Sequence, residues 1–341
     1  MSTIFPTALT PNSTFAITAP SSGVPASLHS RIHKAKDQLE KLGQHVIIGD
    51  TVWTQKAARS SCAENRATEL MSYLTDPGID AIMPPWGGEL LVQVLAKLDW
   101  DKLASNKPKW LIGYSDTSTL LCSYTLQTTI ATAHATNFFD LHMEALDETT
   151  KQWHKVLSAP SRKNFVQYSS PMYQSSWDKL FAQDDAAGFD LDSKTQWKST
   201  TGQPVSFTGR LIGGCLNTLT VIAGTKYAPI QKWRETFEEN TIIYLEWADW
   251  ASAEAYRNLW HLKEHSWFDR ASGVLFGRPA RSTPSEDYTV EQMIHEFADE
   301  IGLPIIYDTD IGHMPPQLTM INGALATVSY QEGNGILTYL E

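Results

Sequence analysis

The sequence predicts an α/β protein whose N-terminal part contains a parallel, doubly wound sheet and whose C-terminal part forms a second α/β domain. Two observations lead to this prediction. Apolar segments typical of buried strands alternate with segments of helical periodicity up to residue 127, and the alternation returns after residue 209. The chain is also long enough, at 341 residues with 42% hydrophobic side chains, to bury two cores.

The N-terminal alternation runs from a strand to a helix four times. Strands are expected at residues 15–20, 45–49, 79–83 and 110–114, and helices at residues 30–42, 63–75, 89–98 and 117–127. Gly43 follows the first helix at the position where a left-handed residue commonly ends a helix. Because strands joined by single helices run parallel, this part of the chain predicts a parallel sheet.

The C-terminal part repeats the alternation after a gap. Strands are expected at residues 242–245 and 273–277 and around residues 305 and 336, and helices at residues 219–223, 253–263 and 290–301. The last helix has the clearest boundaries, because Thr289 and Gln292 can form a capping box and Gly302 follows its end. Residues 141–205 break the pattern with a mixture of polar and isolated aromatic residues. We therefore predict an N-terminal α/β domain at 1–165, a linker or insertion with a substrate loop at 166–205, and a C-terminal domain at 206–341.

Charge and composition restrict the class of partner. A net charge of -11 argues against a nucleic-acid polymer or an anionic membrane, both of which need clustered Lys and Arg. The N-terminus lacks a basic segment followed by a long apolar one, and no apolar run approaches the length of a membrane span, so we expect a cytoplasmic protein. Three widely spaced cysteines without a C-x-x-C pair, Cys62, Cys122 and Cys215, are predicted to be reduced core thiols.

The most informative segment runs from Lys109 to Cys122. An apolar strand stops there at Gly113, and helical periodicity resumes just after Ser115. A residue at a sharp strand-to-helix turn is exposed on a constrained backbone, with N-terminal helix amides beside its side chain. This position makes Ser115 a candidate nucleophile, although a serine here can also act simply as a helix N-cap.

Two further strands end on groups that a serine nucleophile needs. Glu246 ends the strand at 242–245, and His313 follows the strand near residue 305. A serine hydroxyl attacks at neutral pH only when a base takes its proton, and a carboxylate usually fixes the tautomer of that base. Because open α/β sheets place their sites at the carboxyl ends of strands, we predict that Ser115, His313 and Glu246 form a catalytic triad.

A glycine-containing turn offers the donors that an oxyanion needs. The turn at residues 84–89 follows a strand and contains Gly87 and Gly88, whose backbone amides can face a substrate. We predict an oxyanion hole formed by the N–H groups of Gly88 and of Asp116, the residue after the candidate nucleophile. The alternative is a plain turn that needs glycine for a positive φ.

Other motifs support different chemistry less well. His261, Glu264 and His265 match an inverted zinc-protease pattern, but a third metal ligand is not evident, and an exposed helix end explains the same residues. Because that third ligand is missing, we expect no resident metal. Neither glycine-rich phosphate-binding motif occurs, so we expect no nucleotide cofactor. The glycine-rich segment at 208–217 predicts close backbone packing against the site, with Asn217 as a possible substrate contact.

An ordered set of motifs runs along nearly the whole chain. These are Ala19–Ser22, Asn65–Arg66, residues 76–82, Gly87–Gly88, Gly113–Asp116, Gly213–Leu216, Leu245–Glu246 and Gly312–His313. Together they resemble the LD-carboxypeptidase family of serine peptidases. The resemblance implies an N-terminal Rossmann-like or flavodoxin-like domain, a C-terminal swivelling β/α domain and a site between them. It also implies the triad and oxyanion hole named above, no cofactor and a homodimer.

Within this family the chain is more similar to the microcin C self-immunity branch than to the murein tetrapeptide carboxypeptidases. The segment before residue 209 bears aromatic residues, and Trp86 and Glu89 flank the two glycines where the murein branch usually has arginine before them. The immunity enzymes cleave an amide between an aspartyl carboxyl and a modified nucleotide, with an aromatic loop holding the base. By analogy, Trp177 and Trp197 are candidates for base stacking, with ordinary packing as the alternative.

These observations predict a serine hydrolase that cleaves aminoacyl-nucleotide or peptidyl-nucleotide amides. The first alternative is the same chemistry on a murein tetrapeptide, with release of terminal D-alanine. The second is a non-catalytic α/β module that binds a peptide or nucleotide, because a doubly wound fold alone does not define a reaction.

Overall fold

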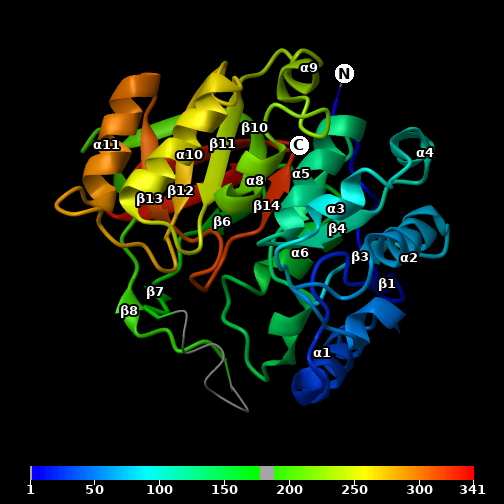
Figure 1. Ribbon diagram of the computed structural model, residues 1–341. Helices are drawn as coiled ribbons and strands as arrows, with labels where there is room; N and C mark the ends of the chain where they lie inside the picture. The colour runs from blue at the N-terminus through cyan, green and yellow to red at the C-terminus, as the bar shows by residue number, and fades with distance from the viewer. Residues whose placement is uncertain (1, 177–187) are drawn as a thin grey trace.

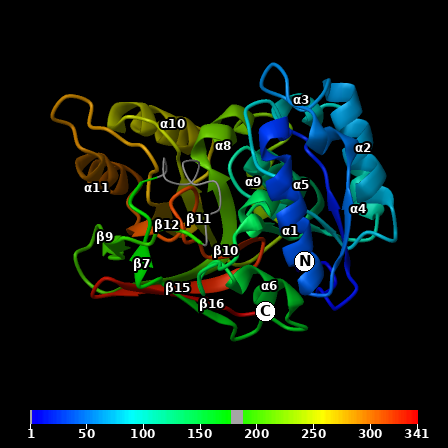
Figure 2. The ribbon, with the colours of Figure 1, turned by 90° about the horizontal axis from the view of Figure 1, so that it is seen from below.

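The structure is a computed structural model that describes residues 2–176 and 188–341 (Figure 1). Within these residues the strands form a six-stranded sheet, an eight-stranded sheet and a two-stranded ribbon. The N-terminal half of the chain and the C-terminal half lie side by side, as Figures 1 and 2 show, with α5 and α8 between them. The predicted α/β class is confirmed.

The first sheet has the flavodoxin-like strand order. In spatial order its strands are β14 (Met320–Asn322), β5 (Thr132–His134), β4 (Trp110–Gly113), β3 (Ala81–Ile82), β1 (Thr14–Ile17) and β2 (His45–Ile48). The five N-terminal strands are parallel, and β14 pairs antiparallel with β5. The strand order reverses between β1 and β3, so the crevice beyond their carboxyl ends is the place where such sheets bind ligands.

The second sheet combines a parallel centre with antiparallel edges. In spatial order its strands are β6 (Val166–Tyr168), β16 (Asn334–Tyr339), β15 (Leu325–Gln331), β10 (Val205–Cys215), β11 (Thr241–Glu246), β12 (Ala271–Gly277), β13 (Ile305–Thr309) and β9 (Lys198–Ser199). The strands from β10 to β13 are parallel, and the remaining pairings are antiparallel. The ribbon consists of β7 (Met172–Tyr173) and β8 (Ser193–Lys194).

Helices cover both sheets. In chain order they are α1 (His29–Lys41), α2 (Ala63–Thr75), α3 (Val92–Leu95), α4 (Trp100–Ser105), α5 (Thr117–Thr128), α6 (Gln152–Ser158), α8 (Leu216–Ile222), α9 (Ile230–Arg234), α10 (Ser252–Glu264) and α11 (Val290–Ile301). The predicted capping box of α11 is confirmed: Gln292 N–H donates to Thr289 Oγ1 at 3.1 Å, and Gly302 ends the helix with a φ of +65°. None of the described helices has the length and hydropathy needed to cross a membrane.

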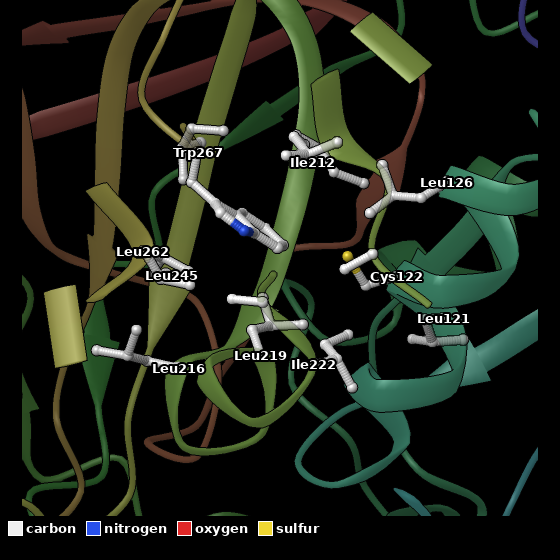
Figure 3. Packing of buried hydrophobic residues seen from close by; sticks show 14 of the residues in the cluster. Leu121, Cys122, Leu126, Ile212, Leu216, Leu219, Ile222, Leu245, Leu262 and Trp267 are labelled. Carbon is white, nitrogen blue, oxygen red and sulfur yellow. The ribbon is translucent and has the colours of Figure 1, made fainter. Parts of the chain in front are cut away.

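One continuous core joins the two halves. Figure 3 shows side chains of α5 on one side of α8 and side chains from β11, α10 and the turn after α10 on the other. Helix α5 is buried on nearly every side, including its Thr and Ser residues. A helix buried all round has a fixed position, so the turn that enters α5 is held rigidly between the sheets.

Asn322 on β14 connects the two large sheets directly. Its Oδ1 accepts hydrogen bonds from the Gly213 N–H at 3.0 Å and from the Tyr244 hydroxyl at 2.7 Å, both in the second sheet. Its Nδ2 donates to Thr132 Oγ1 on β5 of the first sheet at 3.1 Å. The side chain is fully buried, so these bonds are shielded from water and hold the sheets in one relative position.

Several elements differ from the expectation. The helix predicted at 89–98 is reduced to α3, because the Asp116 carboxylate accepts the Leu91 N–H at 2.9 Å and holds the preceding segment as a turn. Strand β10 was not predicted as a strand, because its glycines hid its apolar pattern. β14 lies in the first sheet although it follows residue 206, and β6 and β9 lie in the second. The proposed boundaries 1–165, 166–205 and 206–341 stay a prediction.

Candidate active site

Ser115 lies at a strained turn between β4 and α5. Its φ is +64°, a left-handed conformation that costs a non-glycine residue free energy and is concentrated at functional sites. The turn is fixed on both sides, because the Tyr114 N–H donates to Asn137 Oδ1 at 3.1 Å and the Ser118 N–H donates to the Ser115 carbonyl at 2.8 Å. The Ser115 hydroxyl is thereby directed away from the sheet and toward a cavity.

The structure brings Ser115, His313 and Glu246 together in a hydrogen-bonded row. Glu246 ends β11 and is fully buried, and His313 follows β13 on a loop. His313 Nδ1 lies 2.6 Å from Glu246 Oε2, and His313 Nε2 lies 3.0 Å from Ser115 Oγ. The imidazole therefore bridges the carboxylate and the hydroxyl, as the sequence predicted for these residues.

Electrostatics favour a charged Glu246 beside a basic His313. Burial by itself raises the pKa of Glu246, but His313 and His134 outweigh burial and hold that pKa well below its ordinary value. Burial lowers the pKa of His313, whereas the charges of Glu246 and Asp140 raise it to a value above the ordinary one. An imidazole with a raised pKa is a stronger proton acceptor, which suits a general base.

His134, which sequence reasoning missed, lies behind Glu246. It ends β5, is fully buried, and packs edge-on between the rings of Tyr114 and Tyr244. Its Nε2 is 3.9 Å from Glu246 Oε1, which is too long for a hydrogen bond, and neither atom has another partner among the described residues. An apolar strand ending in histidine was the available signal.

The turn after β3 and the start of α5 meet beside Ser115. Gly88 has a φ of +142°, and a Cβ there would lie 2.9 Å from Ser22 Cβ. The Asp116 carboxylate holds the two segments together by accepting hydrogen bonds from the Leu91 N–H at 2.9 Å and from the Ser21 hydroxyl. Among the described residues, the backbone N–H groups of Gly88 and Asp116 have no acceptor, so both are free to bind one.

Two cavities meet at Ser115, and we call them the polar lobe and the aromatic lobe. The polar lobe has a volume of about 530 Å³, and the aromatic lobe has one of about 310 Å³. Both contain Gly88, Ser115 and His313. The polar lobe is also lined by Glu89, Asp116, Thr119, Asn217, Asp249, Trp250 and Arg281. The aromatic lobe is also lined by Ser22, Pro25, Gln55, Trp86, Tyr114, Asn137, Phe139 and Asp140.

The predicted substrate residues are distributed unevenly over this site. Trp86 lines the aromatic lobe, where its ring packs against Phe139 with centroids 4.8 Å apart. Glu89 and Asn217 line the polar lobe, and burial together with neighbouring carboxylates raises the pKa of Glu89. The Asn217 side chain accepts the Ala248 N–H at 3.1 Å, which fixes its orientation.

Trp197 lies elsewhere. It is 1% exposed, and its indole N–H donates to Asp310 Oδ2 at 2.9 Å, so no ring face is available for a substrate in this conformation. The stacking role suggested for Trp197 is therefore wrong, and the packing alternative holds, because this side chain belongs to the hydrophobic core. Trp177, the other candidate, lies outside the described residues.

The inverted zinc-protease pattern does not form a metal site. The rings of His261 and His265 lie edge to face with centroids 4.6 Å apart, while the Glu264 carboxylate pairs with Lys263. In the part of the chain that the structure describes, these residues do not form a group of three metal ligands. The helix-end interpretation of this motif is the one that fits.

A strained serine bridged by histidine to a buried carboxylate, on the carboxyl edge of parallel sheets, is the architecture of an α/β serine hydrolase. Comparison with known protein families shows which family of serine hydrolases this is. Residues 15–135 match the N-terminal domain of LD-carboxypeptidases, and residues 208–328 match the C-terminal domain. The chain belongs to the LD-carboxypeptidase family of serine peptidases.

Known relatives include both branches of this family. A putative carboxypeptidase of Vibrio cholerae is 28% identical, with 92% of this chain and 91% of the relative covered. The microcin C7 self-immunity protein MccF of Escherichia coli is 25% identical, with 93% and 91% covered. The murein tetrapeptide carboxypeptidase of Pseudomonas aeruginosa is also 25% identical, with 87% of each covered.

Solved structures confirm the two-domain fold. An MccF-like protein of Bacillus anthracis superposes with a TM-score of 0.83 at 25% identity, covering 99% of this chain and 100% of that one. MccF in complex with aspartyl sulfamoyl adenosine superposes with a TM-score of 0.82 at 22% identity, covering 98% of both chains.

Proposed function

We propose that this protein is a Ser-His-Glu amide hydrolase that cleaves aminoacyl-nucleotide or peptidyl-nucleotide amides. The observation that carries the proposed chemistry is the row of contacts from Ser115 Oγ through the His313 ring to Glu246 Oε2, at 3.0 and 2.6 Å. These distances are within the reach required for proton transfer.

In the proposed reaction, His313 Nε2 takes the proton of Ser115 while Oγ attacks the substrate carbonyl. Glu246 stabilises the imidazolium that forms and keeps Nδ1 protonated. The N–H groups of Gly88 and Asp116 donate to the oxyanion of the tetrahedral intermediate. His313 then protonates the leaving nitrogen as the C–N bond breaks, and water repeats the steps on the acyl-serine ester to release the acid.

The two lobes support the proposed substrate class. A scissile carbonyl at Ser115 places the acyl group and the leaving group in different lobes, because the lobes meet at that residue. The aromatic lobe contains Trp86 and Phe139 and offers about 310 Å³, which suits a planar base or nucleoside. The polar lobe, with Asn217 and Arg281 beside three carboxylates, suits a charged amino acid. The binding of aspartyl sulfamoyl adenosine by the similar protein MccF is consistent with this assignment.

The murein tetrapeptide carboxypeptidases provide a second candidate function. One of them is as similar in sequence to this chain as MccF is, at 25% identity. In this alternative the same triad releases terminal D-alanine from an LD-linked peptide. Both substrates place a free carboxylate or charged group close to the scissile amide.

Product analysis separates these functions. We would incubate the protein with an aspartyl-nucleotide amide and with an LD-linked muramyl tetrapeptide and identify the products by mass spectrometry. The proposal predicts aspartate and the amino-nucleotide; D-alanine released from the tetrapeptide alone would replace it with the murein function. Ser115→Ala should lower turnover by about 10³-fold or more, and the exposed Ser72→Ala should not change it. Binding without any product would instead indicate a non-catalytic module.

A cytoplasmic location and a homodimer stay predictions. Sedimentation of the purified protein over a range of concentrations tests the second of these. A monomer at every concentration would exclude the dimer without affecting the proposed chemistry.

A further inference from the structure

Three side chains of metal-binding type gather at the carboxyl ends of β10 and β11. Cys215 and Glu246 are register partners on these parallel strands, and His313 contacts Glu246 from the loop after β13. One possible ligand atom from each of the three residues lies within 4.8 Å of the other two. Two of the three belong to the proposed triad, and the third, the Cys215 thiol, has no part in the proposed reaction.

An ion could reach this group from the cavity. Cys215 is 2% exposed, yet it lines the polar lobe together with His313. Its sulfur lies 3.7 Å from Asn217 Oδ1, a weak contact that a metal–sulfur bond can replace. The other two cysteines do not line this cavity: Cys122 is buried in the apolar core, whereas Cys62 is exposed, so the prediction of a core position is wrong for Cys62.

The charges around the thiol favour a cation over a free thiolate. The Cys215 thiol is 2% exposed and stands beside the fully buried carboxylate of Glu246 on the neighbouring strand. A second negative charge beside a buried carboxylate is unfavourable in this environment, whereas a divalent cation between the two groups neutralises both. Binding of a metal would then release the thiol proton to solvent.

We propose that Cys215, Glu246 and His313 form an inhibitory site for a thiophilic divalent cation, best fitted by Zn²⁺. Cysteine, histidine and glutamate are the ligands that zinc selects, and three protein ligands with one open position are typical of accessible zinc sites. Mg²⁺ and Ca²⁺ prefer oxygen ligands and are excluded by the thiol and imidazole. With metal–ligand bonds of about 2.0 to 2.3 Å, tetrahedral ligand atoms stand about 3.5 Å apart. The thiol therefore needs to approach the other two groups by up to about 1 Å, while His313 Nδ1 and Glu246 Oε2, now 2.6 Å apart, need to separate slightly to admit the ion.

Occupancy of this site stops the proposed reaction. A metal ion bound to His313 and Glu246 removes the bridge between carboxylate and serine, so the imidazole cannot accept the Ser115 proton. This consequence rests on the proposed function, but the metal site itself does not, because the three ligands are present whatever the substrate is.

The metal site is tested without any substrate. Co²⁺ would be added to the wild-type protein, to Cys215→Ser and to the control Cys62→Ser, and the near-ultraviolet thiolate-to-cobalt absorption band measured. Zn²⁺ affinity would be measured by calorimetry at pH 6 and pH 8. We expect the band and one zinc site in wild type and in Cys62→Ser, affinity that increases with pH, and at least about a tenfold loss of affinity in Cys215→Ser. Absence of the band in wild type, or equal affinity in Cys215→Ser, would overturn the proposal.

An activity assay then tests inhibition. Each variant's rate in buffered Zn²⁺ would be normalised to its own rate in chelator, with Cys215→Ala as a second variant in case the serine substitution unfolds the protein. Wild type and Cys62→Ser should be inhibited at the calorimetric affinity, and both Cys215 variants should resist. Equal inhibition of all variants would refute the inhibitory role. If the protein cleaves no amide at all, the proposed function fails while the cobalt and calorimetric results still decide the metal site.

Discussion

Replacing Glu246 by glutamine gives the sharpest test of how the proposed triad works. The substitution keeps the size of a fully buried side chain and an oxygen that can accept from His313, but it removes the negative charge. Two charges spread over a carboxylate and an imidazolium in this contact are separated by about 4 Å, and at an effective dielectric constant of about 20 they attract by about 4 kcal/mol. At about 1.4 kcal/mol for each factor of ten, the variant should lose about 10³-fold in kcat/KM.

The pH profile identifies the cause of that loss. Glu246 raises the pKa of His313, and the neutral imidazole is the active base, so activity should increase with pH through that raised pKa. In Glu246→Gln the remaining activity should have its acid limb at lower pH. The assay is kcat/KM for amide cleavage between pH 5 and pH 9, with thermal unfolding as the check on folding.

A matched control makes the same chemical change at the surface. Glu64 is 68% exposed and pairs with Lys97, so Glu64→Gln should leave both the rate and the pH profile unchanged. A folded Glu246→Gln protein that loses less than about tenfold in kcat/KM, or whose acid limb does not move, would show that Glu246 does not act through its charge on His313.

Three further substitutions test the oxyanion hole, the support of Glu246 and a buried ion pair outside the site. Gly88→Ala should reduce kcat by about 10²-fold with a smaller change in KM, because a Cβ would crowd the hydroxyl of Ser22 and shift the donor N–H; steady-state kinetics measures this, and an unchanged kcat would exclude Gly88 from the oxyanion hole. His134→Gln should move the acid limb and lower kcat by about tenfold if His134 holds Glu246 in place, and an unchanged profile would make its role purely structural. Asp310→Asn should lower the free energy of unfolding by about 3 to 5 kcal/mol in a urea titration, because it leaves the buried guanidinium of Arg278 without its carboxylate partner. A loss below about 1 kcal/mol would contradict this.

The local features of the site were predictable from the sequence. Ser115 stands between an apolar strand and a segment of helical periodicity, and such a strand-to-helix turn can be recognised from about ten consecutive residues of sequence. Glu246 and His313 were predictable as residues at or just after strand ends, which placed them on the same edge as Ser115, and the family resemblance gave most of the support for joining the three. The α11 capping box was also predictable, because Thr289 and Gln292 act within one helical turn.

Long-range features were not predictable in the same way. The position of His134 at the end of a short strand is a weak local signal, and its importance comes from a 3.9 Å approach to Glu246, 112 positions further along the chain. β14 has only three residues, and nothing local indicates that they pair with β5 instead of with a neighbour in the second sheet. Trp197 and Trp86 look alike in the sequence, yet one is enclosed in the core and the other lines a cavity.

The position of Asn322 between the two sheets limits how the protein can admit a substrate. A hinge motion that separated the two sheets would have to break the two buried hydrogen bonds that Asn322 accepts from Gly213 and Tyr244. If β14 moved with the second sheet instead, the bond to Thr132 would break and the edge of β5 would be exposed. Entry and exit must therefore depend on surface loops around the two lobes. The same reasoning implies that a truncated N-terminal half, which lacks β14, would aggregate through the uncovered edge of β5. The residues of the proposed triad therefore depend on both halves folding together in a single chain.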